Sequence, residues 1–148
     1  YYLLSQIPTQ DDGDLTKELM NTVNVSDLQN GLGNLVARVA AMAVNGQWPM
    51  VNGQISAGVA EALEEYKFDT AMGSIWERIK KADQFVSEKR VWELKDKARE
   101  EALPRLVGEI RQIAVDLAPF MPQTAEKINT QFGGEKIVKG EPLFPRLT

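Results

Sequence analysis

The 148-residue sequence contains no cysteine and no histidine. Without cysteine, the chain has no disulfide bond, no zinc–thiolate site and no cysteine nucleophile. Without histidine, it also lacks serine–histidine triads, imidazole metal ligands and the usual general base near neutral pH. These absences exclude many classes of enzyme, and we expect no bound metal.

Long hydrophobic runs are also missing, since the longest covers only residues 39–44. A membrane span needs roughly 18 apolar residues, so we expect no membrane association. The opening Tyr1-Tyr2-Leu3-Leu4 has neither the basic region nor the apolar stretch of a signal peptide. Because no methionine precedes Tyr1, we expect an excised piece of a longer chain. Apolar residues make up 43% and charged residues 26%, which suits one globular domain.

Basic residues are scarce in the first half of the chain. Residues 1–77 contain three basic and ten acidic side chains, whereas residues 78–105 contain nine basic and six acidic ones. The overall charge of −4 argues against binding nucleic acid mainly by neutralising phosphates. A basic patch beside a few unstacked bases is compatible with this charge, although a solvated helix face with ion pairs is the simpler interpretation of residues 78–105.

Apolar residues recur at helical spacing through most of the sequence, and no strand alternation is found. The expected helices cover residues 15–23, 27–44 with Ser26 as N-cap, 56–66, from Asp69 through Val86, from about Pro104 to Leu117, and 123–132. A turn at residues 11–14, a loop at 48–53 and an extended tail at 142–147 complete the chain. The predicted fold class is therefore all-α, an antiparallel helical bundle.

The outer face of the helix expected over residues 27–44 carries an unusual stripe. Asn30, Asn34 and Arg38 follow one another at four-residue spacing, beside Ala37. Solvated helix faces normally carry Glu and Lys, whereas an Asn amide and an Arg guanidinium pair well with the edges of planar bases. Two interpretations stay open, because either a planar polar ligand or a further helix could pack on this face.

Trp92 falls in an irregular segment of the densest basic stretch, whereas Trp76 lies on an apolar helical stripe and is expected in the core. Single-stranded nucleic acids are held where a tryptophan stacks a base and nearby cations hold phosphates. The cations beside Trp92 are Lys89, Arg90, Lys95 and Lys97. From these residues alone, packing of Trp92 in the core is the slightly simpler interpretation.

Five motifs occur in an order that resembles one family. They are Tyr1-Tyr2-Leu3-Leu4 with Asp12-Gly13-Asp14, residues 27–36 (DLQNGLGNLV), Phe68 with Ile75-Trp76, residues 119–128 (PFMPQTAEKI) and residues 142–147 (PLFPRL). Each motif is weak alone, but together they cover nearly the whole chain. Their order resembles the C-terminal part of methionyl-tRNA synthetase, the class I methionine–tRNA ligase.

The resemblance implies a division of the chain into three parts. Residues 1–14 would be the remnant of a junction with a catalytic domain. Residues 15–134 would form the anticodon-binding helical bundle, and residues 135–148 an extended tail packed on it.

The resemblance also implies the residues of the site. In the family, Asn, Asn and Arg at i, i+4 and i+8 face the CAU anticodon, and they match Asn30, Asn34 and Arg38. The family's tryptophan, on which an anticodon base stacks, matches Trp92. The partner implied is methionine-accepting tRNA, together with the catalytic domain of the same parent chain.

No catalytic residue and no cofactor are expected within this chain. The family's enzymes activate methionine with ATP through a signature with two histidines and a lysine-rich loop ending in Lys-Ser, and neither is found here. ATP would therefore bind in a catalytic domain outside this sequence. The resemblance implies a cytoplasmic protein.

Two positions depart from the family pattern. Val91 stands where the family usually has proline before the tryptophan, and Asp83 stands where it usually has asparagine, followed here by Phe85. We expect the valine to loosen the presentation of Trp92. Asp83 is expected to add a negative charge near the RNA surface.

Three alternatives stay open at this point. One is the anticodon-binding domain of a sister class I enzyme, the valyl, isoleucyl, leucyl or cysteinyl synthetase, against which the ending Leu143-Phe144-Pro145-Arg146 argues. Another is a helical module that docks protein on the asparagine face. The third is an enzyme with paired carboxylates such as Glu64-Glu65 or Glu100-Glu101, although adjacent helical residues point about 100° apart and do not converge on a substrate.

Overall fold

The computed structural model describes residues 1–7, 12–48, 50 and 53–145. In this part of the chain every regular element is a helix, which confirms the predicted all-α class. The elements are α1 (Tyr2–Gln6), α2 (Lys17–Val23), η1 (Asn24–Gly33), α3 (Asn34–Ala43), α4 (Ala57–Glu64), α5 (Phe68–Glu88), η2 (Val91–Glu93), α6 (Asp96–Leu117) and α7 (Pro122–Phe132).

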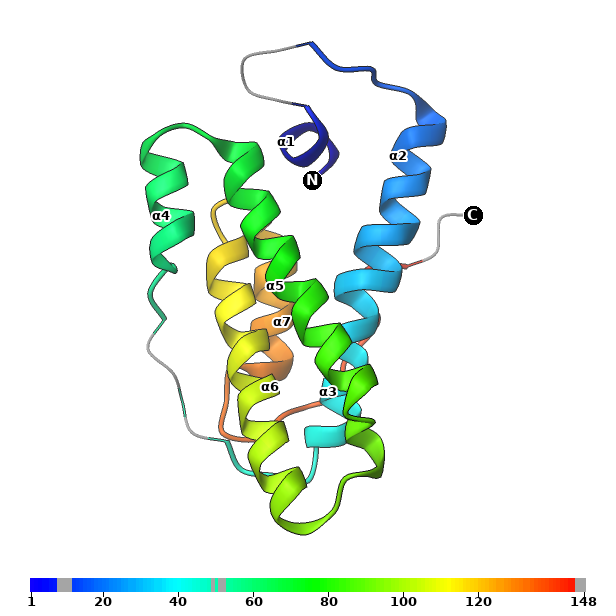
Figure 1. Ribbon diagram of the computed structural model, residues 1–148, viewed down its shortest axis with the longest axis vertical. Coiled ribbons are helices and arrows are strands. Elements are labelled where there is room, and N and C mark those ends of the chain that lie inside the picture. Colours follow the sequence, from blue (N-terminus) through cyan, green and yellow to red (C-terminus); the bar gives the residue numbers. More distant parts are fainter. Residues whose placement is uncertain (8–11, 49, 51–52, 146–148) are drawn as a thin grey trace.

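The helices α5, α6 and α7 run side by side and form the centre of the bundle (Figure 1). On one side α4 folds back along α5, and on the other side η1 and α3 pack against α5 and α6. The short α1 lies against α5. The hydroxyl of Tyr1, which precedes α1, donates a 2.7 Å hydrogen bond to Asp27 in η1. Burial, and then this hydrogen bond, raises the pKa of the Tyr1 phenol.

Aliphatic side chains from the long helices fill the core. Each of the largest buried side chains is less than 2% exposed, and they include Leu32, Leu35, Met72, Ile75, Leu106, Ile110, Ile113, Leu117, Ile128 and Phe132. Burying one such side chain contributes roughly 1.5–3 kcal/mol, so these apolar stripes hold the helices together. Trp76 packs at the edge of the core as a half-buried residue, with its ring centre 4.2 Å from that of Tyr1.

The first long helix differs from the prediction. Separate helices over 15–23 and 27–44 are wrong, because α2, η1 and α3 follow one another without a break from Lys17 to Ala43. The N-cap is Thr16, whose side chain accepts a 3.2 Å hydrogen bond from the Leu19 N–H. Ser26 is not a cap, and its hydroxyl donates to Asp27. Packing of the apolar face outweighs the poor helix propensity of Ser and Asp at this point.

Within that helix, η1 is wound more widely than an α-helix. The N–H of Asn34 bonds the carbonyl of Gln29, five residues earlier, as in a π-helix. Such widened turns are rare and often occur at functional sites. They also give the residues before Asn34 an angular spacing different from the 100° per residue of an α-helix.

Two other helix starts differ from the prediction. The helix α6 begins at Asp96, so Pro104 lies inside it rather than in its first turn. An interior proline removes one backbone hydrogen bond, but Pro104 is exposed and water can bond the carbonyl that is left. The helix α5 begins at Phe68, so Asp69 lies in the first turn, where its charge favours the helix dipole, and is not the cap.

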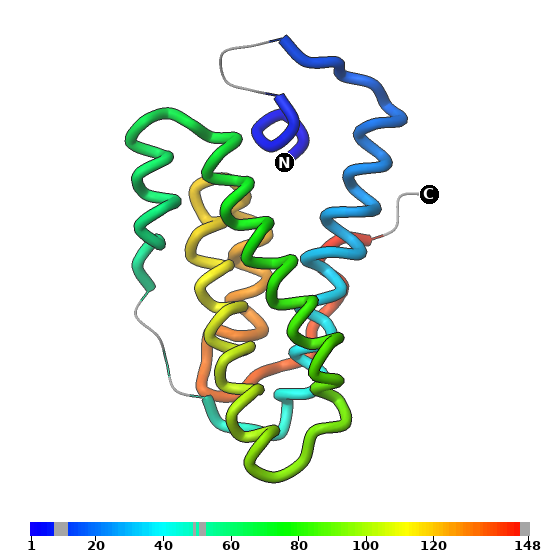
Figure 2. The backbone as a smooth tube through the Cα atoms, in the orientation of Figure 1, coloured from blue at the N-terminus to red at the C-terminus, as the bar shows by residue number. Residues whose placement is uncertain are grey.

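The predicted α4 and α7 agree with the structure to within two residues, and Ser56 precedes α4 as its N-cap. The predicted turn at 11–14, loop at 48–53 and tail at 142–147 lie partly outside the described residues. The described part of the tail contains no helix and passes beside η1 (Figure 2). The division of the chain at residues 14 and 134 stays a prediction.

Candidate nucleic-acid interface

The stripe of Asn30, Asn34 and Arg38 lies on the outer side of η1 and α3. Both asparagines are exposed, and Arg38 is half-buried. Within the described part of the chain, neither asparagine amide makes a hydrogen bond, and the segment that borders them is the C-terminal tail, not a helix. The alternative of a further helix packed on this face therefore does not describe the two asparagines, whereas Arg38 does contact the helix α5.

The two asparagines line a groove between the first long helix and the tail. The groove has a volume of about 470 Å³, and residues 139–145 form its opposite wall. Hydrogen bonds that tie the tail in place include those from Gln29 Nε2 to the Pro145 carbonyl at 3.2 Å, from the Val138 N–H to the Gln131 carbonyl at 2.9 Å, and from the Gly140 N–H to Gln131 Oε1 at 3.3 Å. Leu143 is buried, so the tail wall is part of the packed fold.

Gly33 permits this close approach of the tail. A Cβ atom at position 33 would lie 3.1 Å from the Leu28 carbonyl oxygen and 3.3 Å from the Phe144 ring. Gly31 has more room, because a Cβ there would lie 3.5 Å from the Ser26 carbonyl oxygen as its nearest neighbour. Of these two glycines, only Gly33 is therefore in tight contact with the tail.

Arg38 links the stripe to α5 and η2. Its Nη1 donates to the Asp83 carboxylate at 2.9 Å and to Ser87 Oγ at 3.4 Å. Its guanidinium carbon lies 5.4 Å from the centre of the Trp92 ring, within the range of a cation–π contact. The structure thus brings Arg38 and Trp92, which are far apart in the sequence, into one cluster.

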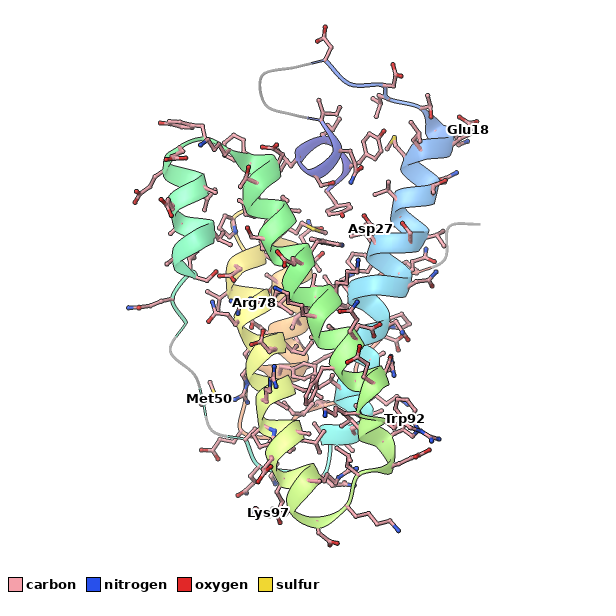
Figure 3. All side chains as sticks on the ribbon, viewed as in Figure 1. Glu18, Asp27, Met50, Arg78, Trp92 and Lys97 are labelled. Carbon is pink, nitrogen blue, oxygen red and sulfur yellow. The ribbon has the colours of Figure 1, made fainter. Side chains whose placement is uncertain are left out.

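Trp92 lies in η2, in the turn between α5 and α6, and is labelled in Figure 3. It is 48% exposed, so the alternative that places it in the core is wrong. The preceding Val91 is fully buried, and Arg90 turns the chain with a left-handed backbone (φ 46°, ψ 52°). The buried Val91 therefore anchors η2 in the core while Arg38 contacts Trp92, and the looser presentation of Trp92 expected from the valine stays a prediction.

The four cations predicted to contact phosphates are all exposed. Arg90 pairs with Glu93 at 2.5 Å, and Lys97 lies 3.9 Å from Glu101 at the start of α6, apart from Trp92 (Figure 3). Over the residues that the structure describes, Lys89 and Lys95 form no ion pair. Surface pairs contribute only about 0–1 kcal/mol, so Arg90 and Lys97 can exchange their carboxylate partners for phosphate.

Sequence reasoning expected Asp83 near the RNA surface, but it missed the contacts of Asp83 and Ser87 with Arg38 and the position of the tail beside the asparagines. Asp83 and Ser87 are four residues apart on α5, a spacing that places both side chains on one face, but nothing in the sequence indicates that Arg38 lies opposite them. The prolines predict an extended tail, but its position beside the asparagines has no local signal, because it depends on contacts with Gln29 and Gln131.

Two buried ionisable side chains stabilise the fold away from this surface. Burial lowers the pKa of Arg111, whose guanidinium donates to the carbonyls of Phe132 at 2.7 Å and Gly134 at 2.6 Å. Asp116 accepts hydrogen bonds from the N–H of Ser56 at 2.8 Å and from its hydroxyl at 2.7 Å. They join the end of α7 and the start of α4 to α6.

Metal sites and membrane spans are two further possibilities for the described residues. In the described ranges, no three Asp or Glu side chains are grouped as metal ligands. No helix in those ranges has the length and hydrophobicity of a membrane span.

The structure is an all-α bundle with an exposed polar face, and comparison with known proteins identifies the family to which it belongs. The family model described as the anticodon-binding domain of tRNA ligase matches residues 53–148, which is more than half of the chain. The chain therefore belongs to the family of tRNA ligase anticodon-binding domains.

Within that class, the similar curated proteins are methionine–tRNA ligases. The chain is 34% identical to the enzyme of Clostridium acetobutylicum over 99% of this chain and 29% of that protein. It is 33% identical to the enzyme of Bacillus subtilis over 99% of this chain and 28% of that protein. The chain thus spans less than a third of the length of these relatives.

Solved structures show the same fold. Methionyl-tRNA synthetase of Mycobacterium tuberculosis bound by methionyl-adenylate superposes with a TM-score of 0.80 at 22% identity, over 98% of this chain and 37% of that one. The free form of the same enzyme gives a TM-score of 0.77 at 21% identity, over all of this chain and 38% of that one. These matches support the helical architecture described above.

Proposed function

We propose that this chain binds the CAU anticodon loop of methionine-accepting tRNA as the anticodon-binding part of a methionine–tRNA ligase. The family match and the names of the relatives support this function. They also favour the methionine branch over the valyl, isoleucyl, leucyl and cysteinyl enzymes. The parent protein would act in the cytoplasm, where tRNA is charged.

The observation that carries the proposal is the contact between Arg38 and Trp92 on an exposed face. An indole that is 48% exposed offers a stacking surface, and stacking contributes roughly 1–3 kcal/mol per base. The adjacent guanidinium supplies donors for a base edge, which is the contact that carries sequence specificity. A helix face that contacts only solvent would need neither an exposed indole nor a guanidinium held beside it.

Each residue of the surface has a distinct role in this proposal. Trp92 stacks an unpaired anticodon base, and Arg38 bonds its edge. Asn30 and Asn34 offer free amide donors and acceptors to a neighbouring base at the mouth of the tail groove. The phosphates are held by exposed cations, of which Lys89, Arg90 and Lys95 lie beside η2 and Lys97 lies farther away in the first turn of α6.

We assign no catalytic step and no cofactor to this chain. Activation of methionine with ATP belongs to the catalytic part of the parent, which lies outside these residues. Purified chain mixed with methionine, ATP and labelled pyrophosphate should give no exchange. Measurable exchange would contradict this assignment.

Binding to two RNA stem-loops tests the proposed function. Fluorescence anisotropy at one fixed salt concentration compares a stem-loop carrying CAU with one whose anticodon is scrambled. We expect tighter binding of the CAU loop, because base contacts distinguish the two while phosphate contacts do not. Equal affinity for both loops, or no binding of either, would contradict the proposal, and the second result would favour a protein-docking module.

A further inference from the structure

The ion pair between Arg38 and Asp83 lies at the centre of the proposed RNA surface. Both side chains are partly covered, with exposures of 28% for Arg38 and 36% for Asp83. A carboxylate repels phosphate, so Asp83 is electrostatically unfavourable on a surface that binds RNA. Asp83 accepts a 2.9 Å hydrogen bond from the Arg38 guanidinium, which points to a role in holding Arg38.

The geometry divides the guanidinium into two ends. Only Nη1 contacts α5, where it bonds the Asp83 carboxylate and Ser87 Oγ. Within the described residues, Nε and Nη2 make no hydrogen bond, and the group as a whole lies over the Trp92 ring. An arginine side chain has several rotatable bonds, and fixing one end of it removes most of its freedom before any ligand arrives.

We propose that Asp83 is a positioning residue for anticodon recognition, which holds Arg38 against Trp92 so that the unused guanidinium donors face the stacked base. This inference rests on the proposed function of the surface. It makes Asp83 a determinant of discrimination between bases, and not only a charge that weakens RNA binding. Aspartate in place of asparagine at this position then strengthens the bond to Arg38, because a carboxylate bonds a guanidinium more strongly than an amide does.

Substitutions at Asp83 distinguish a role in positioning Arg38 from a role as a charge that weakens RNA binding. The dissociation constants of the CAU stem-loop and of a stem-loop with an altered first anticodon base give a discrimination ratio. In Asp83→Ala we expect this ratio to fall about three- to tenfold, as for other coupled side chains in contact. Asp83→Asn keeps an acceptor oxygen and should lose less of the ratio.

Glu88→Gln is the matched control. Glu88 is exposed at the end of α5, and this variant makes the same change in charge at a residue that is not among the Arg38 contacts. We expect Glu88→Gln to strengthen binding of both loops equally and to leave the ratio unchanged. If Asp83 acted only through its charge, substitutions at Asp83 would likewise strengthen binding of both loops equally and leave the ratio unchanged. That result would overturn the inference.

A double-substitution cycle completes the test. If Asp83 acts through Arg38, Asp83→Ala lowers the ratio in the unchanged chain and has no further effect when Arg38→Ala is already present. Thermal unfolding of each variant checks that the bundle stays folded. If the unchanged chain discriminates and every Asp83 variant discriminates equally well, the positioning role is wrong while the proposed function stands. If the unchanged chain does not discriminate, the proposed function itself fails.

Discussion

The interior of the bundle and the outer face of η1 and α3 are built from different residues. Between α5, α6 and α7, aliphatic side chains such as Ile110 are fully buried. On the outer face, Asn34 is exposed, Gly31 and Gly33 lie within η1, and Trp92 is 48% exposed. The difference indicates that substitutions in the interior change the free energy of unfolding, whereas substitutions on the face change RNA binding. Four variants test this separation.

Ile110→Ala should have the largest effect, and it should act on stability. Removing a buried side chain from a packed core costs about 2–5 kcal/mol, because the lost transfer energy is increased by the cavity left behind. Chemical denaturation followed by circular dichroism measures the change. Ile110→Val is the control and should cost only about 0.5–1.5 kcal/mol. Equal effects of the two variants would show that this position is not closely packed.

Trp92→Ala should weaken binding of the CAU stem-loop by roughly 1–3 kcal/mol through loss of base stacking. Helical content should be retained, because the side chain is half-exposed and Val91 anchors η2. Anisotropy measures the affinity, and circular dichroism measures the helicity. If this variant unfolds the bundle, the indole ring serves the core and the stacking role is wrong.

Gly33→Ala should displace the tail wall of the groove. Overpacking costs about 1–3 kcal/mol, and the Cβ would meet the Phe144 ring at 3.3 Å. Hydrogen exchange at the Val138 and Gly140 amides, which bond Gln131, should become faster. Gly31→Ala is the matched control and should leave both amides protected. Equal exchange in the two variants would mean that the tail does not need the glycine.

Lys95→Ala should have the smallest effect, and it should be independent of sequence. Losing one phosphate contact weakens all stem-loops about equally and reduces the slope of log affinity against log salt by about 1. Titrations at several salt concentrations measure the slope. A loss confined to the CAU loop would instead assign Lys95 to base recognition.

Much of the fold follows from the sequence, because apolar periodicity depends on neighbouring residues alone. It predicts the helices that bury Leu35, Ile75 and Ile110, which the structure shows in the core. It fails at Ser26 and Pro104, where local propensity favours a helix start but tertiary packing continues or lengthens the helix.

Part of the candidate site could likewise be predicted from the sequence, and part of it could not. Helical spacing and the family resemblance single out Asn34, Arg38 and Trp92. The grip of Asp83 on Arg38 could not be predicted, because it depends on how α3 packs against α5. The tail groove depends in turn on long-range hydrogen bonds of Gln29 and Gln131.

The central claim is that the stripe and Trp92 distinguish the anticodon, and one ratio tests it most directly. The ratio compares the dissociation constants of a CAU stem-loop and of a stem-loop with an altered first anticodon base, for the unchanged chain and for Arg38→Ala. We predict that the unchanged chain prefers CAU, and that Arg38→Ala lowers this preference by about 1–3 kcal/mol while the protein stays folded. An unchanged chain that binds both loops alike, or a folded Arg38→Ala variant that keeps the full preference, would contradict the claim.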